Sequence, residues 1–195
     1  MKIMLCYKDD MKWIKVLLAV SCSIVVSCAK PGLDSKLSAE HLYVWSNSEV
    51  TEGEDPHAFG FNVELWKHNG KHVGFFSEFV GPGFDPPSGK LDSIQFDEKS
   101  GRLFFTTKLS VGVVRSTTAN EWVPAKNLYE FTGVVDSGAM TGLLRKKTIQ
   151  DSGPATASEE NIVLKGKGPA NPYHDSYEAW VESWAAILKL RGPKW

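Results

Sequence analysis

Cysteine is scarce in this chain of 195 residues, and all three cysteines, Cys6, Cys22 and Cys28, lie close to the N-terminus. The rest of the chain therefore cannot be held by disulfides or build a metal site from thiolates. An excess of positive charge is also lacking, because 22 Lys and Arg residues face 23 Asp and Glu residues. Nucleic-acid binding needs a basic surface that displaces counterions, so we expect no nucleic-acid partner.

A run of apolar residues long enough to cross a bilayer is missing as well. The apolar stretch at residues 16–26 is well short of the roughly 20 residues that a spanning helix needs. It follows the basic residues Lys12 and Lys15, an order that is typical of a signal peptide. Because Asp9 and Asp10 are unusual in such a leader, Met11 is an alternative start.

The leader ends in two branched apolar residues, a small residue and a cysteine, Val25-Val26-Ser27-Cys28. These residues resemble the lipobox of bacterial lipoproteins. The resemblance implies a signal peptide at residues 1–27, attachment of a diacylglycerol to the Cys28 sulfur, and acylation of the new amino terminus. Cys22 is a weaker alternative, because the apolar run before it is shorter. Ala29 follows Cys28, which resembles lipoproteins that diderm bacteria send to the periplasmic face of the outer membrane.

Residues 28–40 are polar and include Pro31 and Gly32, so we expect a lipidated tether. Several acyl chains hold a protein on a membrane without a basic patch, and we expect the membrane to be a partner through the lipid anchor. The remaining residues, 41–195, are expected to form a single β-rich domain.

Apolar and polar residues alternate with the strand period over most of residues 41–165. Turn signals at residues 69–70, 98–101 and 137–138 separate successive runs and indicate consecutive hairpins. We count about eight strands, with a ninth if residues 122–125 form one. The sequence therefore predicts a mainly β fold, an antiparallel meander closed into a barrel or packed as a sandwich.

Two registers are open for the first hairpin. A two-residue turn at Asn69-Gly70 would place Leu65 opposite Gly74, and a three-residue loop would place Leu65 opposite Val73. The second register aligns the apolar sets of the two strands. Because register follows the buried face, we expect the three-residue loop.

The next two hairpins give clearer pairings. In one, Phe96 is expected opposite Leu103. In the other, Gly133 is expected opposite Gly142, and two facing glycines leave room for a sharp bend or for another backbone.

At residues 174–191 the spacing of apolar residues changes from the strand period of two to the helical period of 3.6. Six apolar residues share one face of this helix: Tyr177, Trp180, Val181, Trp184, Ile187 and Leu188. Asp175 with Glu178 three residues later resembles a capping box, and Gly192-Pro193 ends the helix. We expect this amphipathic C-terminal α-helix to pack against the sheet.

This layout, together with the strands at residues 131–133 and 141–143, is similar to the lipocalin-like β-barrels over residues 41–190. The resemblance implies a barrel whose interior binds an apolar small molecule. Aromatic residues at strand spacing would line such a cavity: Phe59, Phe61, Phe75, Phe105 and Phe131. Trp66 lies on the other face of its strand, either under the helix or in a binding surface, and Phe84 is a candidate contact at the rim.

Motifs that carry chemistry are sparse. His68 and His72 diverge in a hairpin, and the acidic residues before His57 form a solvated loop, so we expect no metal site. Glu64 and Glu78 are expected to be outward-facing charges on a half-solvated sheet. No nucleophile elbow is present, and we assign no catalytic residue and no cofactor.

Three functions remain open at this stage. The first is a lipid-anchored, non-catalytic envelope protein that binds an apolar small molecule in its barrel. The alternative is an envelope module with a filled core that contacts another protein or a glycan, and the second alternative is a hydrolase. A cavity would favour the first function, whereas a solid core with exposed apolar residues would favour the module.

Overall fold

The computed structural model describes residues 42–82, 85–116, 118–136, 138–150, 154–167 and 176–195, which all belong to one compact unit, Lys36–Trp195. The predicted leader, the Cys28 lipidation site, the tether, Phe84 and Asp175 lie outside the described residues. In the described ranges, no helix has the length and hydropathy that crossing a membrane requires.

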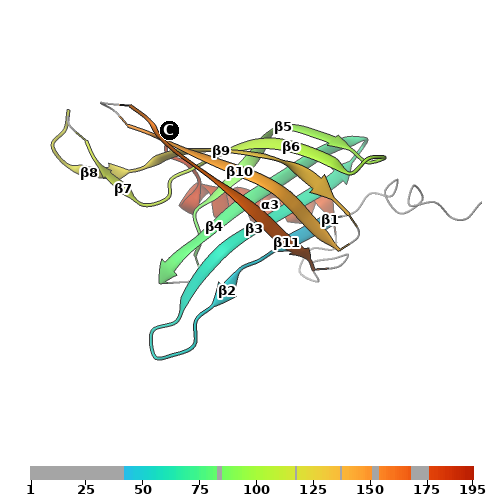
Figure 1. The fold of residues 1–195 in the computed structure, drawn as a ribbon, viewed down its shortest axis with the longest axis horizontal. Coiled ribbons are helices and arrows are strands. Elements are labelled where there is room, and N and C mark those ends of the chain that lie inside the picture. The colour runs from blue at the N-terminus through green and yellow to red at the C-terminus, as the bar shows by residue number, and fades with distance from the viewer. Residues whose placement is uncertain (1–41, 83–84, 117, 137, 151–153, 168–175) are drawn as a thin grey trace, which may run out of the picture. The chain divides into compact units, whose positions relative to one another are not determined.

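The described ranges contain the following strands and one helix (Figure 1): β1 (Leu42–Ser46), β2 (Glu49–Val50), β3 (His57–His68), β4 (Lys71–Pro82), β5 (Ser88–Asp97), β6 (Arg102–Leu109), β7 (Val113–Arg115), β8 (Trp122–Pro124), β9 (Lys126–Val135), β10 (Ala139–Ile149), β11 (Thr156–Gly166) and α3 (Tyr177–Arg191).

Eight of the strands close into an antiparallel barrel. Their order is β1-β11-β10-β9-β6-β5-β4-β3, and β1 closes the ring by pairing with both β11 and β3. The predicted mainly β meander is therefore confirmed, and of the two predicted architectures the chain adopts the barrel. The segment at Trp122 is a strand but not a barrel strand, since β8 pairs with β7 in a separate hairpin.

The two ends of the barrel differ. The end that we call the entry end carries the start of β1 at Leu42 and the turns after β3, β5 and β9. From the opposite, far end two structures project, which Figure 1 shows at the left and the bottom. One is the β7–β8 hairpin, and the other is the finger, formed by residues 47–61 and 78–82 of β2, β3 and β4.

The first hairpin has the register that we did not expect. Leu65 pairs with Gly74, so the prediction of a three-residue loop was wrong. Asn69 and Gly70 form a two-residue turn with φ values of 50° and 71°, the left-handed conformation that Asn-Gly adopts readily. As a result Phe76 points into the barrel, where it is fully buried, and Phe75 points outward.

The other predicted pairings are confirmed, since Phe96 lies opposite Leu103 and Gly133 lies opposite Gly142. The facing glycines make room for an aromatic ring. A Cβ added to Gly142 would lie 2.8 Å from a ring carbon of Phe131.

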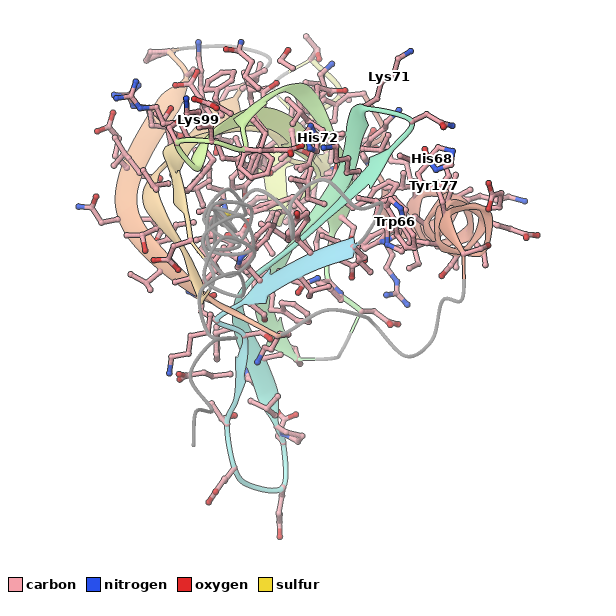
Figure 2. The ribbon with its side chains drawn as sticks, turned by 90° about the vertical axis from the view of Figure 1, so that its right-hand side faces the viewer. Trp66, His68, Lys71, His72, Lys99 and Tyr177 are labelled. Carbon is pink, nitrogen blue, oxygen red and sulfur yellow. The ribbon has the colours of Figure 1, made fainter. Side chains whose placement is uncertain are left out.

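Helix α3 lies outside the barrel against β1, β3 and β4, as Figure 2 shows with the helix viewed end-on. Its contact face contains the six apolar residues predicted from the sequence. Ser176 caps the helix by accepting a hydrogen bond from the Ala179 backbone N–H, and Gly192 ends it. The helix runs from the entry end, where Tyr177 stacks on His68, toward the far end.

Candidate functional site

The barrel axis is occupied by aromatic side chains. The Phe76 ring centroid lies 5.5 Å from that of Phe61 and 6.1 Å from that of Phe105, and the Phe105 centroid lies 5.2 Å from that of Phe131. Tyr129 joins them at 5.3 Å from Phe76. All five residues belong to one buried cluster, so contact between the rings continues across the interior.

The six predicted ligand-binding residues that the structure describes are not brought to one site. Phe61, Phe105 and Phe131 lie in the filled interior, whereas Phe75 and Trp66 lie on the outer wall under α3. Phe59 stands on the finger with 48% of its surface exposed.

The structure also contains an open hollow of about 720 Å³, lined by residues of β5, β6 and β9. Phe96, Phe104 and Val134 are among its lining residues. None of the six predicted residues in the described ranges lines it.

A buried carboxylate fastens α3 to the barrel. The indole N–H groups of Trp180 and Trp184 both donate to Oε2 of Glu64, at 2.7 and 2.9 Å. The Asn62 side chain donates to Oε1 at 3.3 Å. Glu64 is only 9% exposed, so the prediction of a half-solvated charge was wrong for this residue. Two tryptophans spaced by four residues on an apolar helix face need acceptors, and this signal in the sequence points to such a carboxylate.

Glu78 is buried too, but it faces the interior near the far end. Tyr129 donates its hydroxyl hydrogen to this carboxylate, and Lys146 Nζ lies 3.0 Å from Oε1. Burial, followed by the negative charge of Glu78, raises the pKa of the Tyr129 hydroxyl far above its ordinary value. Glu64 and Glu78 therefore lie on opposite faces of the wall, and they cannot act together on one substrate.

A second polar network closes the interior at the entry end, which faces the viewer in Figure 2. Glu98 lies 2.7 Å from Lys67 Nζ and 3.2 Å from His72 Nε2. Burial lowers the pKa of His72, although the nearby Glu98 opposes this effect. Burial, with a smaller contribution from Glu98, raises the pKa of Tyr43 to about 12.

Outside this network, an aromatic cluster lies between β3 and the start of α3. The rings of His68 and Tyr177 are parallel with centroids 4.0 Å apart, and Trp66 packs edge-on against Tyr177 at 5.9 Å (Figure 2). The indole N–H of Trp66 is buried and has no acceptor among the described residues. Of the two placements that the sequence left open for Trp66, the structure shows the one under the helix.

The two projections at the far end expose large apolar side chains. On the finger, Val50, Phe59 and Val80 are 53%, 48% and 48% exposed, and Phe59 pairs directly with Val80 across the strands. On the β7–β8 hairpin, Val113 is 62% exposed and Trp122 is 69% exposed. Five of the eight exposed large apolar residues in the described ranges thus belong to the two projections.

Neither the Glu78 network nor the Glu98 network offers a site for a metal ion. Within the described ranges, no group of three or more His, Cys, Asp or Glu side chains is placed to hold one. Glu78 interacts with Tyr129 and Lys146, and Glu98 interacts with Lys67 and His72. The two carboxylates therefore have a structural role at the two ends of the packed interior.

No protein-family model, curated protein or solved structure matches this chain in the comparisons with known proteins. The resemblance to the lipocalin-like barrels stays a prediction.

Proposed function

We propose that this protein is a lipid-anchored bacterial envelope lipoprotein that acts without catalysis, as a module that binds another protein through the two projections at its far end. The observation that carries the proposal is the contrast between the barrel interior and the two projections. Aromatic rings fill the interior, where the sequence predicted an apolar small molecule to bind, while the finger and the β7–β8 hairpin expose apolar side chains.

The positions of the two ends support this reading. Leu42, the first described residue, lies at the entry end, so a chain that leads from an anchor at Cys28 would join the domain at this end. The exposed apolar residues of both projections are then directed away from the anchored end, where a partner in the periplasm has access to them.

The shape of the finger suits recognition by a protein. Phe59 and Val80 are opposite each other on neighbouring strands and expose apolar surface on a hairpin that stands off the barrel (Figure 1). Exposed aromatic residues of this kind are enriched where protein partners meet.

Site-specific photo-crosslinking in cells tests the proposal. A photoreactive amino acid is placed at Phe59 or Trp122 in the full-length chain, and at Val163 as a control. Val163 is a suitable control because it is 54% exposed on β11, away from both projections.

We expect an adduct of one mass from the Phe59 and Trp122 positions, and none from Val163. The Val80→Asp substitution should abolish the Phe59 adduct, because it places a charge in the apolar contact. Equal adducts from all three positions, or none from the two projections, would overturn the proposal.

A further inference from the structure

Exposed positive charge gathers at the entry end of the barrel. The side chains that carry it belong to the turns after β3 and β5, the start of β6 and the end of β11: Lys71, Lys99, Arg102, Lys165 and Lys167. Each of them is exposed, and none forms an ion pair with another residue in the part of the chain that the structure describes. Figure 2 shows Lys71 and Lys99 on two different turns at this end.

Fewer negative charges face the solvent at the same end. Asp97 and Asp136 accept hydrogen bonds from the backbone N–H groups of their own turns, and Glu178 lies in the first turn of α3. Glu98 is engaged by Lys67 and His72. Arg102 lies opposite Asp97 across the strands, and among the described residues the exposed cations at the entry end outnumber the exposed carboxylates.

The finger at the far end has the opposite charge. Within the loop that joins β2 to β3, Glu52, Glu54 and Asp55 are all exposed, and Glu49 precedes them on β2. His57 is the titratable base nearby, and it lies 3.2 Å from Asp55. Among the described residues, acidic charge is thus concentrated on the finger, whereas exposed cations lie at the entry end and also on the barrel wall toward the far end, at Lys108 and Lys147.

The chain enters the barrel at its positive end. Residues 28–41 separate the predicted anchor from Leu42. A chain of that length reaches at most about 50 Å even when fully extended, which limits how far the entry end can lie from the surface that holds the anchor. Basic side chains near an anionic bilayer are attracted to it within about 10 Å, the Debye length.

We propose that the entry end docks on an anionic phospholipid surface through Lys71, Lys99 and the neighbouring cations. The contact orients the domain with its acidic finger pointing away from the bilayer. The biological orientation rests on the proposed lipid anchor, but the attraction belongs to the folded domain and does not require the anchor.

The test uses the anchor-free compact unit, residues 36–195, in sedimentation with vesicles. One vesicle population contains phosphatidylglycerol and phosphatidylcholine in equal amounts, and the other contains phosphatidylcholine alone. The test variant carries Lys71→Glu and Lys99→Glu. The matched control carries Lys147→Glu and Lys189→Glu, which change the net charge equally at exposed positions on β10 and α3.

We expect binding to the anionic vesicles at low salt and none to the neutral vesicles. The test variant should bind at least tenfold more weakly than the control, because each cation near the surface contributes roughly a fivefold change in affinity. Absence of binding to anionic vesicles, or equal losses in the two variants, would overturn the inference. Neither result would bear on the anchor, which is tested separately by measuring the mass of the protein with its acyl groups on Cys28.

Discussion

Two buried carboxylates, Glu64 and Glu78, face opposite sides of the same part of the barrel wall. Both look alike in the sequence, since each is the one carboxylate of a strand and is flanked by apolar or small residues. Their partners are far away along the chain, since Glu64 meets Trp180 and Glu78 meets Tyr129. Periodicity describes neighbours along one strand and contains no information about such partners, which is why sequence reasoning placed both carboxylates in solvent.

Replacing Glu64 by leucine tests its role in holding α3. The Glu64→Leu variant leaves the indole N–H groups of Trp180 and Trp184 without their acceptor, and we expect the free energy of unfolding to fall by about 2–4 kcal/mol. Denaturant unfolding followed by tryptophan fluorescence measures the change.

The matched control is Trp66→Phe, which removes a buried N–H that has no acceptor in the described residues. We expect it to change stability by less than about 1 kcal/mol, because the lost packing is offset by the removal of an unsatisfied donor. Equal costs for the two substitutions would show that Glu64 is not a specific acceptor.

His72 gives stability a dependence on pH. Its pKa is lowered from 6.5 in the folded protein, chiefly by burial, so folding favours the neutral ring. The stability that His72 contributes is therefore present above pH 6.5 and is lost as the pH falls through the folded pKa. We expect the free energy of unfolding to fall between pH 7 and pH 5, and His72→Gln to flatten that slope.

Denaturant unfolding curves recorded at several pH values measure the slope. A slope for His72→Gln as steep as that of the natural chain would contradict the assignment.

At the scale of elements, the strands, their order and the helix were accessible from the sequence, and one register was not. The contact face of α3 and the pairing of Gly133 with Gly142 follow from periodicity and turn residues. The register of β3 and β4 failed because β4 is buried on both faces, with Phe76 inside the barrel and Phe75 under α3. Hydrophobic alternation cannot choose between two buried faces, and the Asn-Gly turn was the better guide.

The facing glycines lead to a prediction about β10. In Gly142→Ala, the new Cβ would lie 2.6 Å from the Gly133 Cα and 2.8 Å from the Phe131 ring. We expect a loss of about 2–3 kcal/mol in the free energy of unfolding, because both strands and the ring must move.

Gly138→Ala is the comparison, since the nearest atom to its added Cβ is 3.8 Å away. Thermal or denaturant unfolding should place this variant within about 0.5 kcal/mol of the natural chain. If Gly142→Ala were equally harmless, the ring would not depend on the space that the glycines provide.

At the scale of the whole molecule, the predicted ligand-binding residues failed to converge for a related reason. Five phenylalanines at strand spacing are compatible with a hollow or a filled barrel, and periodicity does not report volume. The unexpected inward turn of Phe76 supplies the ring that bridges Phe61 and Phe105, and so fills the axis. The exposed residues of the finger and of the β7–β8 hairpin then become the surface most suited to binding.

The mass of the intact protein, extracted from the membranes of cells that produce it and measured under native conditions, tests the central claim most directly. The account predicts a chain that begins at Cys28, carries acyl groups on that residue and holds no small molecule. An unmodified Cys28, or an apolar compound that remains bound to the folded domain, would contradict it.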